Sequence, residues 1–148
     1  MTNSTVKLHR VIKAKPDKVY KAFNNPLALA FWIPPYGFLC EIHEMDFKIG
    51  GSFKMSFYNF NTQKKHSFGG NYIEIQENER IVYTDKFEDP NLLGEILTTI
   101  TFEQVSCGTS LNIIQEGIPS VIPLELCYLG WQESLEKLIN LVEPEIIE

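Results

Sequence analysis

A long amphipathic pattern near the end of the chain places the strongest constraint on the fold. Between Pro119 and Glu143, apolar residues recur at steps of three and four with polar residues between them, the period of a helix with one apolar face. The apolar stripe consists of Leu124, Cys127, Tyr128, Trp131, Leu135, Leu138 and Val142. A stripe this long needs a broad apolar partner, which a sheet can supply. The helix start is expected between Ser120 and Pro123, with Ser120 favoured as the cap.

The chain from Phe38 onward has the period of two that is typical of strands. Alternating, β-branched and aromatic residues occupy six stretches, at 38–46, 52–60, 66–76, 80–88, 95–105 and 109–117. Because the connections are short, neighbouring strands should pair antiparallel as a meander. Gly50-Gly51 is expected in a turn, and Gly69-Gly70 in a strand bend or bulge.

The N-terminal part of the chain predicts one more strand and two short helices. A loose alternation over Thr5–Ala14 favours a strand at a sheet edge or crossing. Pro16 suits the first turn of a helix that reaches about Asn24. A second helix should begin near Pro26 and stop before Pro34-Pro35. The predicted class is α+β, with an antiparallel sheet of about six or seven strands and the helices on one face.

Composition narrows the choice of partners and compartment. The 148 residues, 44% hydrophobic and 22% charged, suit one domain spanning 1–148. A net charge of −6 opposes binding to nucleic acid or anionic membranes. The sequence contains neither a signal-peptide pattern nor an apolar run long enough to span a membrane, so a cytoplasmic location is expected. Its three scattered cysteines favour neither disulfides nor zinc.

Motifs for metal or covalent chemistry are lacking in the sequence. His43, Glu44 and Asp46 are close in sequence, but neighbouring residues of a strand point to opposite faces. Neither a zinc motif, a GxSxG elbow nor a phosphate loop occurs. We therefore expect no metal, cofactor or assigned catalytic residue. Acid–base chemistry by Asp85, Tyr83 or His66 on a bound ligand stays open as an enzymatic alternative.

Polar residues on otherwise apolar strand faces give the sequence its functional content. Tyr83, Asp85, Thr98 and Gln115 fall on faces expected to meet the terminal helix. A polar group in an apolar interior costs roughly 1–3 kcal/mol unless it is paired. These side chains must bond to one another in a solid core, or to water or a ligand in a cavity. The sequence leaves both alternatives open.

Several short motifs, in order along nearly the whole chain, resemble the SRPBCC superfamily, and more closely the branch related to the C-terminal domain of the activator of Hsp90 ATPase. The matching residues are Ala14, Pro16, Val19, Ala22, Phe23, Pro26, Trp32, Gly37-Phe38, Met45-Asp46, Gly50-Gly51, Gly70, Tyr72, Glu74-Ile75, Glu79-Arg80-Ile81, Tyr83-Thr84, Glu116-Gly117-Ile118-Pro119, Gly130-Trp131, Ser134, Leu135, Leu138 and Leu141. The resemblance implies a helix-grip fold, in which a curved antiparallel sheet wraps around a long C-terminal helix, with a hydrophobic cavity between the sheet and the helix. Superfamily members bind lipids, hormones or polyketides, and some catalyse cyclisation.

The expected function is binding of a small hydrophobic ligand between the sheet and the terminal helix. The alternatives are a chaperone-associated protein similar to the Hsp90 ATPase activator and an enzyme similar to polyketide cyclases. Homodimerisation stays open. The candidate cavity residues are Phe31, Trp32, Phe38, Met55, Phe57, Phe68, Tyr72, Tyr83, Asp85, Phe87, Thr98, Gln115, Cys127, Tyr128 and Trp131.

Overall fold

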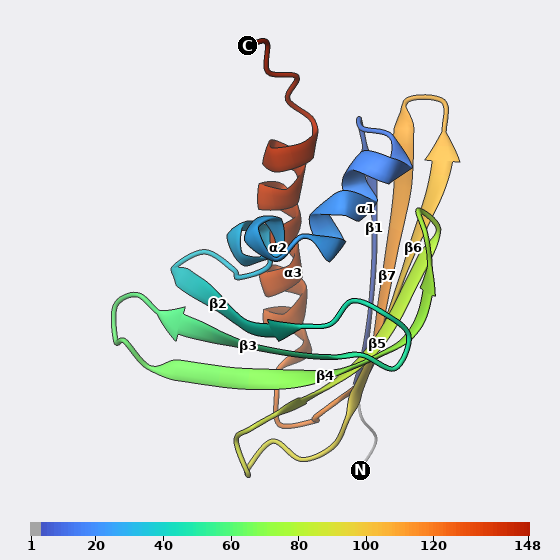
Figure 1. The fold of residues 1–148 in the computed structure, drawn as a ribbon. Coiled ribbons are helices and arrows are strands. Elements are labelled where there is room, and N and C mark those ends of the chain that lie inside the picture. Colours follow the sequence, from blue (N-terminus) through green and yellow to red (C-terminus); the bar gives the residue numbers. More distant parts are fainter. Residues whose placement is uncertain (1–3) are drawn as a thin grey trace.

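The protein is described from a computed structural model, which covers residues 4–148. Within these residues the chain forms seven strands and three helices (Figure 1). The elements in chain order are β1 (Ser4–Ile12), α1 (Pro16–Asn24), α2 (Pro26–Trp32), β2 (Phe38–Met45), β3 (Ser52–Asn59), β4 (Lys65–Gln76), β5 (Arg80–Phe87), β6 (Ile96–Val105), β7 (Gly108–Ile118) and α3 (Leu124–Val142). The predicted order of one strand, two short helices, six strands and one long helix is confirmed.

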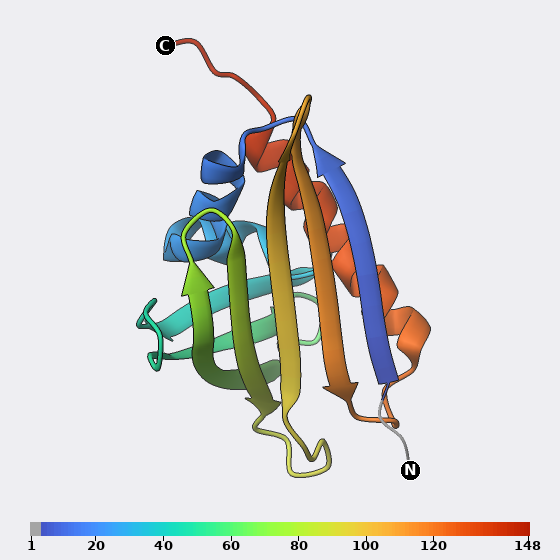
Figure 2. The same cartoon turned by 90° about the vertical axis from the view of Figure 1, so that its right-hand side faces the viewer.

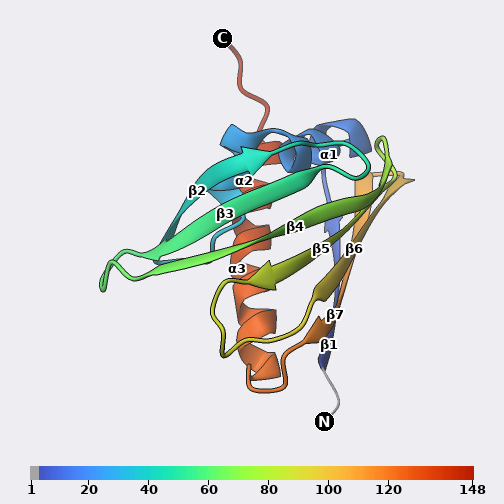
Figure 3. The same cartoon turned by 60° about the horizontal axis from the view of Figure 1, so that its bottom comes forward.

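All seven strands belong to one antiparallel sheet with the order β1-β7-β6-β5-β4-β3-β2. The six strands from β2 to β7 form the expected meander, and β1 adds to β7 as an edge strand. The sheet curls around α3, as Figure 3 shows, while Figure 2 shows β1, β7, β6 and β5 side by side. This is the helix-grip fold. None of the helices in residues 4–148 is long and apolar enough to cross a membrane.

The helices α1 and α2 lie over the C-terminal part of α3 (Figure 1). Asn25 starts α2, because its side-chain oxygen accepts hydrogen bonds from the backbone N–H groups of Leu27 and Ala28. The indole N–H of Trp32 donates to the carbonyl oxygen of Ala22 at 2.8 Å and ties α2 to α1. The N-terminal part of α3 faces the sheet without such a helical cover, and the cavity described below lies there.

The start of α3 differs from the prediction. Its first helical residue is Leu124 and its cap is Pro123, so the interpretation of Ser120 as the cap was wrong. A separate turn precedes the helix, in which the backbone N–H of Ile122 donates to the carbonyl oxygen of Pro119. Pro123 is in an extended conformation, with ψ of 130°, and this separates the turn from the helix.

The bulge considered for the glycine pair on β4 is not found there. Gly69 and Gly70 pair in regular register with Lys86 and Asp85, and the irregularity on β4 lies between Tyr72 and Glu74 instead. Gly70 has a different role, because a Cβ there would overlap the carbonyl oxygen of Thr84. The absence of a side chain therefore lets β4 approach β5 closely at Asp85. In contrast, Gly50 lies in the expected turn with φ of +84°.

The core fills the space between the curved sheet, α1, α2 and the C-terminal part of α3. Alternate residues of β6 are buried, among them Thr98 and Ile100, which are both 0% exposed. The stripe on α3 contributes Leu135, Leu138 and Val142. The predicted inward faces of the strands are thus confirmed, and they carry their polar residues into the interior.

Candidate ligand-binding cavity

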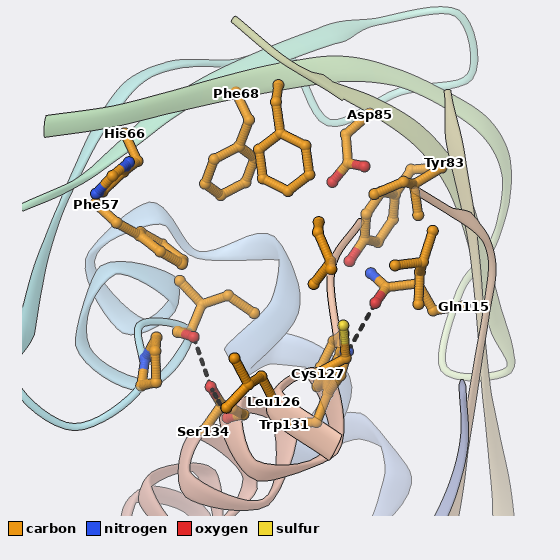
Figure 4. A pocket seen from close by; sticks show the side chains of 17 residues that line it. Phe57, His66, Phe68, Tyr83, Asp85, Gln115, Leu126, Cys127, Trp131 and Ser134 are labelled. Atoms are coloured by element: carbon orange, nitrogen blue, oxygen red, sulfur yellow. Dashed lines mark hydrogen bonds between the residues drawn. The ribbon is translucent and has the colours of Figure 1, made fainter. Parts of the chain in front are cut away.

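A cavity of about 310 Å³ lies between the sheet and the N-terminal half of α3 (Figure 4). Its walls come from β3 to β7, from the turn after α2 and from the first turns of α3. Eight predicted residues line it: Phe57, Phe68, Tyr83, Asp85, Phe87, Gln115, Cys127 and Trp131. Nine others complete the lining: Ile33, Pro35, His66, Ile96, Ile118, Ile122, Leu126, Gly130 and Ser134. The lining is mostly apolar, as is typical of small-molecule sites.

Tyr83, Asp85 and Gln115 line what we call the polar end of the cavity, and Thr98 lies behind Gln115. The side-chain oxygen of Gln115 accepts a hydrogen bond from the indole N–H of Trp131 at 3.1 Å. Its amide nitrogen donates to the hydroxyl of Thr98 at 3.2 Å. These bonds hold the Gln115 side chain across the gap between α3 and β6 and satisfy Thr98, which is fully buried.

Asp85 is the exception at the polar end. Its Oδ1 atom is buried and has no hydrogen-bond partner among residues 4–148. Figure 4 shows its carboxylate directed into the cavity beside Tyr83. Burial, with a smaller contribution from the negative charge of Glu95, raises the pKa of Asp85 from 3.8 to about 7. Burial and the Asp85 charge also raise the pKa of Tyr83, so that its phenol stays neutral at neutral pH.

The opposite end of the cavity opens to solvent. Exposed His66 on β4 and Leu126 on α3, which is 56% exposed, lie at this mouth together with Pro35. The hydroxyl of Ser134 donates to the carbonyl oxygen of Ile33 at 2.6 Å, and this bond fixes the turn after α2 against α3 (Figure 4). The mouth is therefore built by segments that are far apart in the sequence.

A smaller void of about 40 Å³ lies next to the cavity, deeper in the core. Ile33, Phe68, Tyr83 and Asp85 line both spaces, so they form the partition between them. The other residues that line the void are apolar, except for Tyr72. Its lining includes two further predicted residues, Met55 and Tyr72.

The other predicted lining residues lie elsewhere. Trp32 is fully buried in the core, whereas its neighbour Phe31 is 53% exposed with the Lys137 ammonium 5.8 Å from its ring centre. Phe38 lines a separate surface recess near the β3–β4 hairpin. The hydroxyl of Tyr128 faces β1, where it accepts a hydrogen bond from the backbone N–H of Lys7. Thr98 lies behind the cavity wall and reaches it only through Gln115.

A histidine–serine pair on the other face of the sheet was missed by the sequence reasoning. His43 Nε2 lies 2.7 Å from the hydroxyl oxygen of Ser56, and His43 Nδ1 lies 3.9 Å from a carboxylate oxygen of Glu41. Such an order of groups can activate a serine. Ser56 is 0% exposed, however, and also bonds to the hydroxyl of Ser67, so no substrate can reach it. The pair therefore holds β2, β3 and β4 together.

The part of the chain that the structure describes contains neither a metal site nor a disulfide. Residues 4–148 contain no group of three His, Cys, Asp or Glu side chains placed to hold a metal ion. The three cysteines are free, and burial raises the pKa of the Cys127 thiol in the cavity wall. The thiol therefore stays protonated at neutral pH and contributes an apolar surface. The arrangement suits non-covalent binding, and Asp85 offers a buried polar atom that has no partner among residues 4–148.

Solved structures of similar proteins share the fold. The crystal structure of protein CV1439 from Chromobacterium violaceum has 55% sequence identity and a TM-score of 0.94, and the match covers 95% of this chain and 98% of that one. A protein from Rhizobium leguminosarum, 22% identical, has a TM-score of 0.78 over 97% of this chain and 96% of its own. An AHSA1-like protein from Aeromonas hydrophila, 17% identical, has a TM-score of 0.77 over 95% and 92%. At these lower identities the likeness shows the fold alone.

The family comparison agrees with the geometry. No protein with a curated description matches the chain. The family model described as Activator of Hsp90 ATPase homolog 1-like protein matches residues 13–143, which include every strand from β2 to β7 and all three helices. The chain therefore belongs to the family of Activator of Hsp90 ATPase homolog 1-like proteins, in the SRPBCC superfamily.

Proposed function

We propose that this protein binds a small, largely apolar molecule in the cavity between the sheet and α3. The observation that carries the proposal is an apolar space of about 310 Å³ that contains one buried carboxylate oxygen without a partner among the described residues. Pockets for small molecules usually enclose about 300–1,000 Å³ and combine apolar walls with a few polar groups. The volume supports a compact ligand of about two or three rings.

The position of the cavity supports reversible binding. Larger surface recesses exist, but the largest are lined by exposed charged residues such as Lys15, Lys18 and Lys65. The cavity instead lies between regular elements that are held in place by hydrogen bonds, such as the one from Ser134 to Ile33. A ligand entering at Leu126 would exchange water contacts for apolar walls, which stabilises the complex by roughly 25 cal/mol per Å² of apolar surface buried.

Gly130 offers a direct test of this proposal. It lies on α3 in the cavity wall, and a Cβ built there meets no atom within 4 Å. Gly130→Leu should fill the cavity without disturbing the helix, whereas Gly130→Ala should leave most of the space open. The probe is N-phenyl-1-naphthylamine, a neutral dye whose emission rises in apolar surroundings. We expect saturable binding to the native chain and to Gly130→Ala, and at least a tenfold loss for Gly130→Leu.

Two results would contradict the proposal. One is equal dye binding by the native chain and Gly130→Leu when both have the same circular dichroism spectrum and cooperative unfolding. The other is an absence of saturable dye binding together with native mass spectra of gently purified protein that contain only the bare chain. A bound mass that disappears in Gly130→Leu would in turn identify the natural ligand.

An acid–base enzyme is a second candidate, and a single observation favours it. A carboxyl group with a pKa of about 7 in an apolar cavity suits a general base, because its protonation state changes near neutral pH. This candidate predicts that Asp85→Asn abolishes turnover of a bound ketone that can enolise, with little change in binding. If proton exchange next to the carbonyl is no faster with the native protein than with Asp85→Asn, the candidate fails.

A chaperone partner is the third candidate, and its support is the family description, which names activation of the Hsp90 ATPase. The cavity itself does not favour it. A pull-down with the Hsp90 homologue of the same cell, followed by an ATPase assay, decides the question. Stimulation of the ATPase that is equal for native and Gly130→Leu protein would favour a surface interaction over cavity binding.

A further inference from the structure

We propose that the ligand of the cavity is an apolar amine, whose ammonium group donates hydrogen bonds to the carboxylate of Asp85. This inference rests on the proposed function and specifies the chemical class of the ligand. It starts from Asp85 Oδ1, which is buried, lacks a partner among residues 4–148 and belongs to a side chain directed into the cavity. An ionised carboxylate only accepts hydrogen bonds, so the complementary ligand group must be a donor.

Among residues 4–148, no lysine or arginine lines the cavity beside Asp85, and His66 is the only basic side chain in the lining. Gly70 pairs with Asp85 across β4 and β5, and His66 lies four residues before Gly70 on β4. At about 3.3 Å per residue of strand, this places His66 roughly 13 Å from that pair. His66 is therefore a group of the mouth, and the described residues that line the cavity provide no counter-ion next to the carboxylate.

The neighbouring polar groups are already occupied. Gln115 accepts from Trp131 and donates to Thr98, so the two ends of its amide are engaged. Tyr83 is a neutral phenol whose hydroxyl shares a hydrogen bond with the side chain of Thr98. Among the described residues, the charged acceptor that a ligand meets at the polar end is therefore Asp85.

Electrostatics favour a cation and oppose an anion. The negative charge of Glu95, from the loop before β6, acts on Asp85 and raises its pKa. A ligand carboxylate would add a third negative charge to those of Asp85 and Glu95 in a space of low polarity. An ammonium group would instead form an ion pair with Asp85. Because Asp85 is already buried in the folded protein, the pair compensates a desolvation cost that folding has incurred. Fatty acids and other apolar carboxylates are thus expected to be poor ligands.

Three naphthalene compounds of similar shape test the inference: 1-naphthylmethylamine, 1-naphthylmethanol and 1-naphthoate, which are a cation, a neutral alcohol and an anion at pH 8. Their dissociation constants are measured by calorimetry and by displacement of N-phenyl-1-naphthylamine. A hydrogen bond to a charged group corresponds to roughly a 10- to 100-fold change in affinity. We expect the amine to bind that much more tightly than the alcohol, and the carboxylate to bind more weakly than both.

Two variants separate the role of Asp85 from a general effect of negative charge. Asp85→Asn keeps the size of the side chain and should remove the preference for the amine while the alcohol still binds. Glu95→Gln is the matched control and should retain most of the preference, because Glu95 is not part of the cavity lining. Unchanged dye binding by both variants shows that the cavity is intact.

The inference and the proposed function fail in distinguishable ways. Equal affinity of amine and alcohol for the native protein, or an amine preference that survives in Asp85→Asn, overturns the amine inference. The proposed function stands in that case, provided that dye binding is lost in Gly130→Leu. An absence of binding by the dye and by all three compounds would overturn both.

Discussion

The indole N–H of Trp131 donates a 3.1 Å hydrogen bond to the side-chain oxygen of Gln115, and this bond joins the terminal helix to the sheet at the cavity wall. Gln115 passes the connection on to Thr98 on β6. The apolar stripe of α3 thus contains a polar contact at the point where the core gives way to the cavity. The packing of the helix and the shape of the site depend on the same residues.

The contribution of the hydrogen bond between Trp131 and Gln115 to stability should be measurable as a coupling energy in a double-mutant cycle. We expect Trp131→Phe and Gln115→Leu each to lower the free energy of unfolding, because each leaves a polar group without its partner. The double variant should lose less than the sum of the two, with a coupling of about 0.5–1.5 kcal/mol. Urea unfolding of all four proteins measures the cycle. Strict additivity would show that the bond does not contribute.

Asp85→Asn should stabilise the ligand-free protein in a manner that depends on pH. The pKa of Asp85 is about 7 in the folded protein and 3.8 ordinarily, so the folded state holds the proton more tightly and native stability falls as pH rises. The variant lacks this dependence. The free energy of unfolding of the variant should therefore exceed that of the native chain above about pH 4. The difference should become constant above about pH 7, at no more than about 4 kcal/mol.

The measurement is urea unfolding of native protein and variant at intervals from pH 4 to pH 8. Tyr83, Glu95, His66 and Cys127 are present in both proteins, so the difference between the two isolates the effect of Asp85. A gap that stays constant over this range would contradict the raised pKa. A saturating amine should narrow the gap at pH 8, because it binds the ionised native side chain.

The fold was predictable from the sequence because its signals are local. Alternation along β6 reports directly which residues face inward, and the stripe on α3 reports which face the sheet. The start of α3 was missed because Ser120 and Pro123 fit a helix cap equally well in sequence. The deciding feature is the turn that Pro119 closes, which is a property of the folded backbone.

The cavity was predictable only in part, for a similar reason. Asp85, Tyr83 and Gln115 lie on strands, where alternation assigns the face. The residues of the mouth, such as Pro35 and Ser134, were missed because their position depends on how α2 packs on α3. The neighbours Phe31 and Trp32 form an equally aromatic pair in sequence, yet one is exposed and the other lies in the core. Only tertiary packing decides between them.

Ser134→Ala should loosen the mouth. The Ser134 hydroxyl donates to the carbonyl oxygen of Ile33 at 2.6 Å and lies 3.0 Å from that of Gly130, and Ser134 itself is buried. Its loss leaves the Ile33 carbonyl without this donor, so stability should fall by about 1–3 kcal/mol. Dissociation of N-phenyl-1-naphthylamine, followed by stopped-flow fluorescence, should become faster. Ser134→Thr keeps the hydroxyl and should restore most of both values; an unchanged dissociation rate in Ser134→Ala would show that the turn does not control access.

Alanine substitutions at two glycines should have opposite effects. A Cβ at Gly70 would overlap the carbonyl oxygen of Thr84 and lie 2.7 Å from the Cα of Asp85, so β4 and β5 must separate where the carboxylate is held. We expect Gly70→Ala to lower the free energy of unfolding by roughly 3 kcal/mol and to weaken amine binding. Gly130→Ala adds its methyl group to open space within a helix and should raise stability by about 1 kcal/mol. Thermal unfolding of both variants provides the comparison. A Gly70→Ala protein as stable as the native chain would show that the sheet can relax there, and that the close approach of the strands is not what fixes Asp85.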